Sequence, residues 1–234
     1  MCGKERTGCP GSTCTVTRLP GRTYRPQVLW LWWQGRGEPD LQADVVRVAL
    51  IRGAFEFQGQ KCSAASRAYV PASLWKRLRD ELVAETEGLS MGDVRDLSNF
   101  MGAVIDERAF AKHKAAIARA KRSKTLDVVA GGQVDDSKGY FVRPTVVEGG
   151  DPTDQMFSTE YFGPILAVHV YDDAAFEDVV AQMESFASYA LTGSIIAQDR
   201  RAIAWATEAL RFAAGNFYIN DKPTGAVVGQ QPFG

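Results

Sequence analysis

The chain has 234 residues, of which 45% are hydrophobic and 24% charged, ordinary proportions for a globular protein of one large domain or two small ones. The formal net charge is −1, so the charge does not indicate a nucleic acid or a membrane surface as partner. No apolar run reaches the length of a membrane-spanning helix, and with only two histidines, far apart in sequence, no metal site is predicted.

Residues 1–42 differ from the rest of the chain. They contain three of the four cysteines and three of the five tryptophans. The run at 28–33 is apolar but too short to cross a bilayer, and neither helical nor alternating periodicity continues through the segment. The remaining cysteine, Cys62, stands alone in the main body, which favours a reducing compartment over a disulfide scaffold.

Regular patterns begin after residue 42. Residues 43–57 predict a helix, because apolar side chains recur there at helical spacing. Residues 66–70 predict a short strand that ends at Pro71. Ser73 predicts the N-cap of a second helix. The inner face of that helix would carry three leucines, Leu74, Leu78 and Leu82.

A further helix is predicted to begin after Asp106, whose side chain suits an N-cap. Phe110 and Ile117 would face the core of the domain. The outer face is basic and is interpreted as a solvated surface. It carries Lys112, Lys114, Arg119 and Lys121.

The second half of the chain alternates between strands and helices. Pro144 indicates an edge strand or a bulge, and His169, among apolar neighbours, is interpreted as structural. Predicted strands span 126–130, 140–147, 165–171, 191–197 and 215–220, and predicted helices span 173–186 and 200–210. This alternation predicts an α/β domain, a layered αβα arrangement around a largely parallel sheet.

The stretch around Cys62 is the most informative part of the chain. Four small residues, 63–66, follow the thiol directly and leave room for a substrate to approach the sulfur. Lys61 precedes it, and a neighbouring cation favours a thiolate. Composition alone leaves two interpretations open, a reactive cysteine and a buried structural one.

Residues 55–67, Phe-Glu-Phe-Gln-Gly-Gln-Lys-Cys-Ser-Ala-Ala-Ser-Arg, resemble the nucleophile segment of aldehyde dehydrogenases. They are most similar to the branch that oxidises glutamate semialdehyde, the 1-pyrroline-5-carboxylate dehydrogenases. The resemblance implies that Cys62 is the nucleophile and that its backbone N–H helps to stabilise the oxyanion. It also implies NAD as cofactor, with a thiohemiacetal and then a thioester formed on the cysteine.

A second segment, residues 159–166, resembles the Glu-x-Phe-Gly-Pro segment of the same family. The resemblance implies that Glu160 holds the ribose hydroxyls beside the nicotinamide and that Phe162 packs near that ring. A carboxylate suits a diol because it accepts two hydrogen bonds. By pattern alone, the favoured interpretation is an exposed acid and a core phenylalanine at the start of a strand.

A third segment, residues 215–234, is similar to the substrate-anchoring region of the semialdehyde-oxidising branch. There a Thr-Gly-Ala or Thr-Gly-Ser turn presents backbone N–H groups to the substrate α-carboxylate, and glycine lets the main chain approach closely. The resemblance implies a further hydrogen bond from Ser63 and an aromatic contact with the aliphatic part of the substrate. The implied substrate contacts are Ser63, Thr224, Gly225, Ala226 and Phe233.

The resemblance covers residues 43–234, which predicts a truncated catalytic domain that lacks most of the Rossmann-like cofactor domain. In the family, a Glu-x-Gly-Gly-Lys motif upstream of the cysteine supplies the general base. Here that place holds 30–35, Trp-Leu-Trp-Trp-Gln-Gly. Reading 32–35 one base later gives Gly-Gly-Lys or Gly-Gly-Arg without restoring the Glu. We therefore expect residues 1–42 to be an unmatched segment, frame-shifted or disordered, with a divergent extension as the alternative.

The predicted family function is oxidation of L-glutamate 5-semialdehyde to L-glutamate in proline catabolism, with the isolated chain inactive or nearly so. Two alternatives stay open: a non-catalytic chain that docks on a full-length subunit, and an aldehyde dehydrogenase of another specificity. The expected partner is a small-molecule substrate, without nucleic acid or membrane. The resemblance implies a homo-oligomer for intact members but does not extend this to the chain alone. The expected location is the cytoplasm if the source is bacterial and the mitochondrial matrix if it is eukaryotic.

Overall fold

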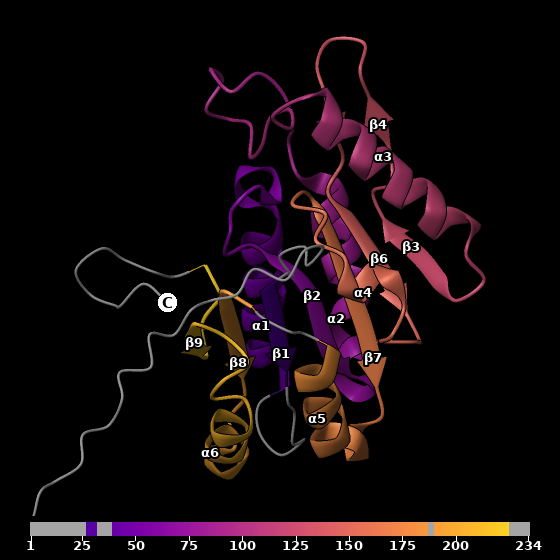
Figure 1. Cartoon of the computed structure of the whole chain (residues 1–234). Coiled ribbons are helices and arrows are strands. Elements are labelled where there is room, and N and C mark those ends of the chain that lie inside the picture. The colour runs from indigo at the N-terminus through magenta and orange to yellow at the C-terminus, as the bar shows by residue number, and fades with distance from the viewer. Residues whose placement is uncertain (1–26, 32–38, 187–189, 225–234) are drawn as a thin grey trace, which may run out of the picture.

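The computed structural model describes residues 27–31, 39–186 and 190–224. Within these residues, seven strands form one sheet in the order β3-β6-β7-β2-β1-β8-β9 (Figure 1). Neighbouring strands are parallel except at one edge, where β3 runs antiparallel to β6. The strands are β1 (Gln27–Leu31), β2 (Ala65–Pro71), β3 (Leu126–Ala130), β6 (Thr145–Gly149), β7 (Ile165–Tyr171), β8 (Thr192–Ile196) and β9 (Asn216–Ile219), and a separate hairpin pairs β4 (Val134–Asp135) with β5 (Phe141–Val142).

Helices cover both faces of this sheet. Successive side chains of a strand point to opposite faces, and β7 shows the two layers: Leu166 and Val168 pack with α1 and α2, whereas Ile165 and Ala167 pack with α3 and α4. At the other end of that second face, α5 and α6 pack together (Figure 1). The helices are α1 (Pro39–Phe55), α2 (Ala72–Gly88), α3 (Glu107–Arg122), α4 (Gln155–Ser158), α5 (Phe176–Phe186) and α6 (Arg200–Ala209), with short 3₁₀ turns η1 (Glu56–Gly59) and η2 (Asp173–Ala175).

The predicted α/β class, with αβα layers around a largely parallel sheet, is confirmed. A strand covered on both faces needs an almost continuous apolar sequence, and six of the seven residues of β7 are buried. One strand was not predicted. β1 lies in the middle of the sheet, between β2 and β8, although it comes from the segment 1–42. The first helix also begins earlier than expected, at Pro39.

The N-cap predicted for the second helix is wrong. α2 begins at Ala72, so Ser73 lies inside its first turn. The Ser73 backbone N–H donates to Asp173 Oδ1 at 3.0 Å. A carboxylate from the segment after β7 therefore accepts a hydrogen bond from a backbone N–H that the first turn of the helix leaves unpaired. No local pattern reveals a partner so far away in sequence. The leucine face was predicted correctly, since Leu74, Leu78 and Leu82 are all buried.

Pro144 divides the predicted strand 140–147 into β5 and β6. The edge position is wrong for β6, which lies between β3 and β7. Pro144 is tolerated because it falls in the gap between the two strands, where no ladder bond is required. The alternative, a bulge, does not fall at Pro144 either, because the pairing of β3 with β6 shifts on β3, between Val128 and Ala130.

The helix after Asp106 was predicted correctly. The Asp106 carboxylate accepts a hydrogen bond from the Ala109 backbone N–H at 2.8 Å. The outer face is solvated at Lys112 and Lys114. Arg119 departs from that interpretation, because its guanidinium is partly buried and pairs with Asp154 at 2.6 Å.

Candidate active site

Cys62 lies in a tight loop between α1 and β2. Three successive residues of this loop have left-handed backbone, Phe57 (φ 53°), Gln58 (φ 59°) and Gly59 (φ 64°). Such conformations are strained for residues with a side chain, and this strain concentrates at functional sites. A β-carbon on Gly59 would lie 2.5 Å from the Ala54 carbonyl oxygen, so only glycine fits. The cysteine that follows is exposed, and the interpretation as a buried structural cysteine is wrong.

Cys62, Glu160 and Phe162 line one small cavity of about 20 Å³. They come from the segments that lead into β2 and β7, which are parallel neighbours in the sheet. A cavity of this size holds about one water molecule. The structure thus brings the predicted nucleophile together with both predicted cofactor contacts.

Glu160 presents a partly buried carboxylate to this cavity. Burial raises the pKa of Glu160, and the positive charge of Lys112 offsets only part of that rise. No residue in the described part of the chain donates a hydrogen bond to this carboxylate. A carboxylate without a protein donor is suited to a ligand that brings its own, such as a diol.

His113 of α3 packs against the turn at residues 160–163. The Phe162 backbone is left-handed (φ 57°) and its side chain is 41% exposed. A β-carbon on the next residue, Gly163, would lie 1.9 Å from His113 Nε2. That nitrogen lies 3.1 Å from the Tyr161 carbonyl oxygen. Burial lowers the pKa of His113, so the neutral imidazole donates its Nε2–H to this carbonyl.

Two further side chains tie the loop and the turn to their surroundings. The Gln60 amide nitrogen donates to the Phe162 carbonyl oxygen at 3.4 Å, and its Oε1 accepts from the Ile105 backbone N–H at 2.8 Å. Arg67, fully buried in β2, donates to the Phe157 carbonyl oxygen at 2.6 Å. These hydrogen bonds hold the backbone at Phe162 and, before Glu160, at Phe157.

The supporting roles of these residues were not predicted from the sequence. A signal existed for His113, which lies three residues after Phe110 and four before Ile117, so helical spacing places it on the buried face. Gln60 and Arg67 lie inside the segment that carries the family resemblance, but their partners come from distant parts of the chain.

The predicted substrate contacts are described only in part. Ser63 follows Cys62 in the loop and is partly buried. Thr224 ends the segment after β9, and its buried hydroxyl has no hydrogen-bond partner among the described residues. Three predicted contacts lie outside the described residues, Gly225, Ala226 and Phe233. The roles of all five stay predictions.

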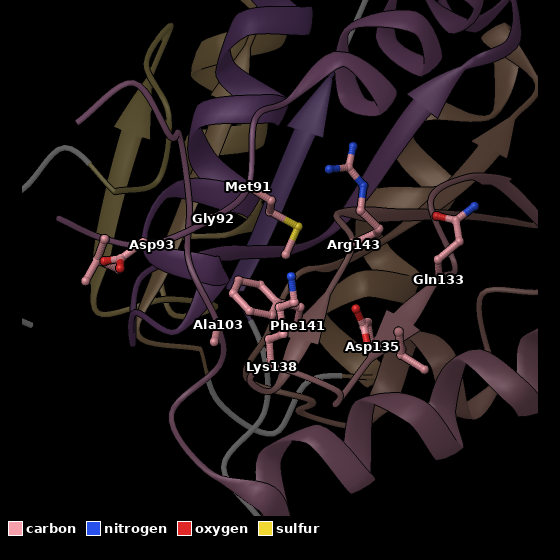
Figure 2. Close-up of a pocket in the computed structure, with 11 residues that line it drawn as sticks. Met91, Gly92, Asp93, Ala103, Gln133, Asp135, Lys138, Phe141 and Arg143 are labelled. Carbon is pink, nitrogen blue, oxygen red and sulfur yellow. The ribbon is translucent and has the colours of Figure 1, made fainter. Parts of the chain in front are cut away.

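A larger cavity, of about 840 Å³, lies elsewhere, between the loop after α2 and the β4–β5 hairpin (Figure 2). Its lining includes Met91, Lys138, Phe141 and Arg143 but none of the predicted site residues. Arg143 donates to the Glu87 and Leu89 carbonyl oxygens at the end of α2, a structural use of its charge. We therefore place the candidate site at the smaller cavity, where the chemistry-bearing residues meet.

The family model described as "Aldehyde dehydrogenase family" matches residues 38–234. The chain belongs to the aldehyde dehydrogenase family. The matched range contains Cys62, Glu160 and Phe162 together with the strands that position them. It begins before residue 43, in agreement with the start of α1 at Pro39.

Two individual relatives show which members of the family the chain resembles. The mitochondrial Delta-1-pyrroline-5-carboxylate dehydrogenase of Bos taurus is 48% identical over 192 residues, covering 82% of this chain and 34% of the relative. The corresponding Dictyostelium discoideum protein is 50% identical over 184 residues, covering 79% of this chain and 33% of the relative. The chain thus spans about a third of the length of the curated relatives that it matches.

Solved structures agree with the sequence comparison. The Delta-pyrroline-5-carboxylate dehydrogenase of Mycobacterium tuberculosis superposes with a TM-score of 0.83 at 54% identity, covering 91% of this chain and 38% of that chain. A second structure of that enzyme, bound with NAD, gives a TM-score of 0.82 at 52% identity. In the described part of this chain, no helix is long and apolar enough to cross a membrane, and no group of three or more His, Cys, Asp or Glu side chains could hold a metal ion.

Proposed function

We propose that the chain supplies the nucleophile, a cofactor contact and part of the substrate site for the NAD-dependent oxidation of L-glutamate 5-semialdehyde to L-glutamate in proline catabolism. The observation that carries the proposal is the single cavity shared by Cys62 and Glu160. The names of the relatives and the NAD-bound structure of the mycobacterial enzyme support this substrate and cofactor.

The chemistry begins with the Cys62 thiolate, which adds to the aldehyde carbon and forms a thiohemiacetal with a negatively charged oxygen. The Cys62 backbone N–H donates to this oxyanion. The chemistry that NAD supplies when bound is acceptance of the hydride that leaves the same carbon. A thioester on the sulfur remains, and its hydrolysis by water releases the acid and restores the thiol.

Two residues of this chain would hold the nicotinamide half of the cofactor. Glu160 would accept hydrogen bonds from the ribose hydroxyls, which would provide the donors that its partly buried carboxylate lacks among the described residues. Phe162, with its exposed ring, would pack near the nicotinamide. The turn that carries both residues lines the same cavity as Cys62. The nicotinamide ring and the Cys62 sulfur would therefore both reach the aldehyde carbon of the substrate.

The substrate α-carboxylate would be held by hydrogen bonds from the loop and from the segment after β9. The Ser63 hydroxyl and the backbone N–H groups of the Thr-Gly-Ala turn donate to it. Phe233 packs against the aliphatic part of the substrate. The residues proposed for the turn are Thr224, Gly225 and Ala226.

The partner in this proposal is a small-molecule aldehyde. Residues 43–234 would form the catalytic domain, with β1 and the start of α1 joined to it from the segment upstream. The eukaryotic relatives are named as mitochondrial, and we propose the mitochondrial matrix for a eukaryotic source and the cytoplasm for a bacterial one.

The test measures competition for the Cys62 thiol. Iodoacetamide alkylates the chain, and mass spectrometry of the Cys62 peptide gives the rate with and without added aldehyde. Glutamate semialdehyde should slow alkylation of Cys62 at lower concentration than butanal does, because only the former carries an α-carboxylate for the proposed anchor. Cys9 and Cys14, which precede the family-matched range, serve as internal controls and should show no selective protection.

Each outcome decides one part of the proposal. Equal protection by the two aldehydes would contradict the carboxylate anchor, and no protection would contradict Cys62 as the nucleophile. Formation of NADH is a separate measurement. We expect little turnover from the isolated chain, because its sequence lacks the general-base motif, and any turnover should fall at least ~1,000-fold in Cys62→Ala. Robust turnover would refute the expected inactivity and leave the nucleophile assignment intact.

A further inference from the structure

One carboxylate at the base of the nucleophile loop receives three positively charged side chains. Glu56 Oε2 accepts from Lys61 Nζ at 2.9 Å and from Lys222 Nζ at 3.3 Å. Its Oε1 lies 2.7 Å from Arg52 Nε. Lys61 belongs to the nucleophile loop, whereas Lys222 belongs to the segment after β9, 166 residues from Glu56. Glu56 therefore joins two segments that are far apart in sequence.

The groups that make this junction are largely withdrawn from water. The side chains of Glu56, Lys61 and Lys222 are 17%, 23% and 30% exposed. Ion pairs at such depth are screened less than pairs on the open surface. Burial raises the pKa of Glu56, but the hydrogen bonds and charges of Lys61 and Lys222 outweigh it and hold the pKa below its ordinary value. Glu56 is therefore ionised at neutral pH.

Packing supports the same junction. A β-carbon on Gly53 of α1 would lie 3.5 Å from Pro223 Cδ, so the helix and the segment after β9 are in close contact. The Ser194 hydroxyl of β8 donates to the Asp221 carbonyl oxygen. The segment is thus held against α1 and β8 just before it reaches Thr224.

We propose that Glu56 is a positioning residue that sets the distance between the nucleophile loop and the segment leading to Thr224. Lys61 directly precedes Cys62, and Lys222 lies two residues before Thr224. The inference rests on the proposed function only for the claim that Cys62 and Thr224 serve one substrate. It also changes the role expected of Lys61, whose ammonium is directed at Glu56.

Hydrogen–deuterium exchange of the whole chain, read by mass spectrometry, tests the junction without requiring activity. Glu56→Gln keeps the shape of the side chain and removes its charge, and Lys222→Met removes the partner with a side chain of similar length. Each variant should speed exchange of the amides at 220–224 by about fivefold or more, because local opening becomes easier. The double variant should be no faster than Glu56→Gln alone, because Glu56→Gln already breaks the contact that Lys222→Met removes.

A matched control is available in Glu148→Gln. The Glu148 side chain is 29% exposed and pairs with Arg79 at 3.4 Å, away from the loop. This variant should leave exchange at 220–224 unchanged. Wild-type exchange in Glu56→Gln, or additive effects in the double variant, would overturn the proposal. If Glu56→Gln did not fold by circular dichroism, Lys222→Met alone would decide in the same way.

The competition assay at Cys62 separates positioning from general stability. Glu56→Gln should raise the concentration of glutamate semialdehyde needed to protect Cys62 from iodoacetamide, while the alkylation rate without aldehyde changes less than about threefold, because the change affects substrate placement. Unchanged protection by the semialdehyde in Glu56→Gln would overturn the proposal. Absence of any reaction at Cys62 in the wild-type chain would count against the proposed function, whereas the exchange result would still decide the role of Glu56.

Discussion

Gly59 of the nucleophile loop and Gly163 of the turn that carries Phe162 are in direct backbone contact. A β-carbon on Gly59 would lie 2.7 Å from the Gly163 carbonyl oxygen, and one on Gly163 would meet the ring of His113. The absence of side chains at both positions lets the candidate nucleophile and cofactor contacts approach each other.

Gly59→Ala should lower the free energy of unfolding by about 2–4 kcal/mol, because it adds a backbone clash to a left-handed conformation. Urea denaturation measures the change. Gly150→Ala is the matched control, since a β-carbon there meets no atom within 4 Å, and it should stay within about 0.5 kcal/mol of wild type. Equal stability of the two variants would contradict the close approach.

Gly163→Ala should also destabilise the chain, by about 1–3 kcal/mol, because the new methyl group overlaps the His113 ring. His113→Ala should relieve that overlap, so the double variant should lose less stability than the sum of the two single variants. Denaturation of the four proteins gives this coupling. Strict additivity would show that the ring and the glycine are not in contact.

Stability should fall as the pH is lowered below about 6.5, because burial lowers the pKa of both His113 and His169 while an unfolded histidine takes up its proton near pH 6.5. The unfolded chain binds more protons in that pH range, so the stabilising effect is complete above it and is lost on acidification. His113→Gln keeps a donor for the Tyr161 carbonyl oxygen and should flatten the dependence. Urea midpoints measured across this range test it, and an unchanged slope would contradict the prediction.

The start of α2 distinguishes two predictions. If Ser73 were the N-cap, Ser73→Ala would cost about 1 kcal/mol. Its buried hydroxyl has no hydrogen-bond partner among the described residues, so we expect this variant to be neutral or slightly stabilising. Asp173→Ala should instead lower stability by about 0.5–1.5 kcal/mol, because it removes the acceptor of the Ser73 backbone N–H. Thermal denaturation of both variants decides between the two caps.

Local pattern predicted most of the fold. The apolar run of β7 and the leucine face of α2 depend only on nearby residues and on burial, and both were predicted correctly. β1 was missed because periodicity alone does not identify a short apolar run, such as residues 28–33, as a buried strand. The Ser73 cap was wrong for a different reason, since the acceptor lies a hundred residues away.

In the candidate site, too, residues in recognisable local segments were predicted, and residues that act through distant contacts were not. Cys62, Glu160 and Phe162 were found through segments that resemble a known family, and the structure places them around one cavity. His113 and Glu56 were missed because their importance comes from contacts with other segments, Tyr161 in one case and Lys222 in the other. Such contacts become visible only when the chain is folded.

The place of β1 also determines the order in which the sheet can assemble. β1 precedes both of its neighbours, β2 and β8, in the sequence, and β8 pairs with it across more than 160 residues of chain. In the described residues, β1 is the only strand that joins β8 and β9 to the other four. Long-range parallel pairing of this kind is slow, and until it forms, β2 and β8 expose unpaired edges that invite self-association. Residues 27–31 therefore link the two parts of the sheet, and we expect mutations there to increase aggregation during refolding.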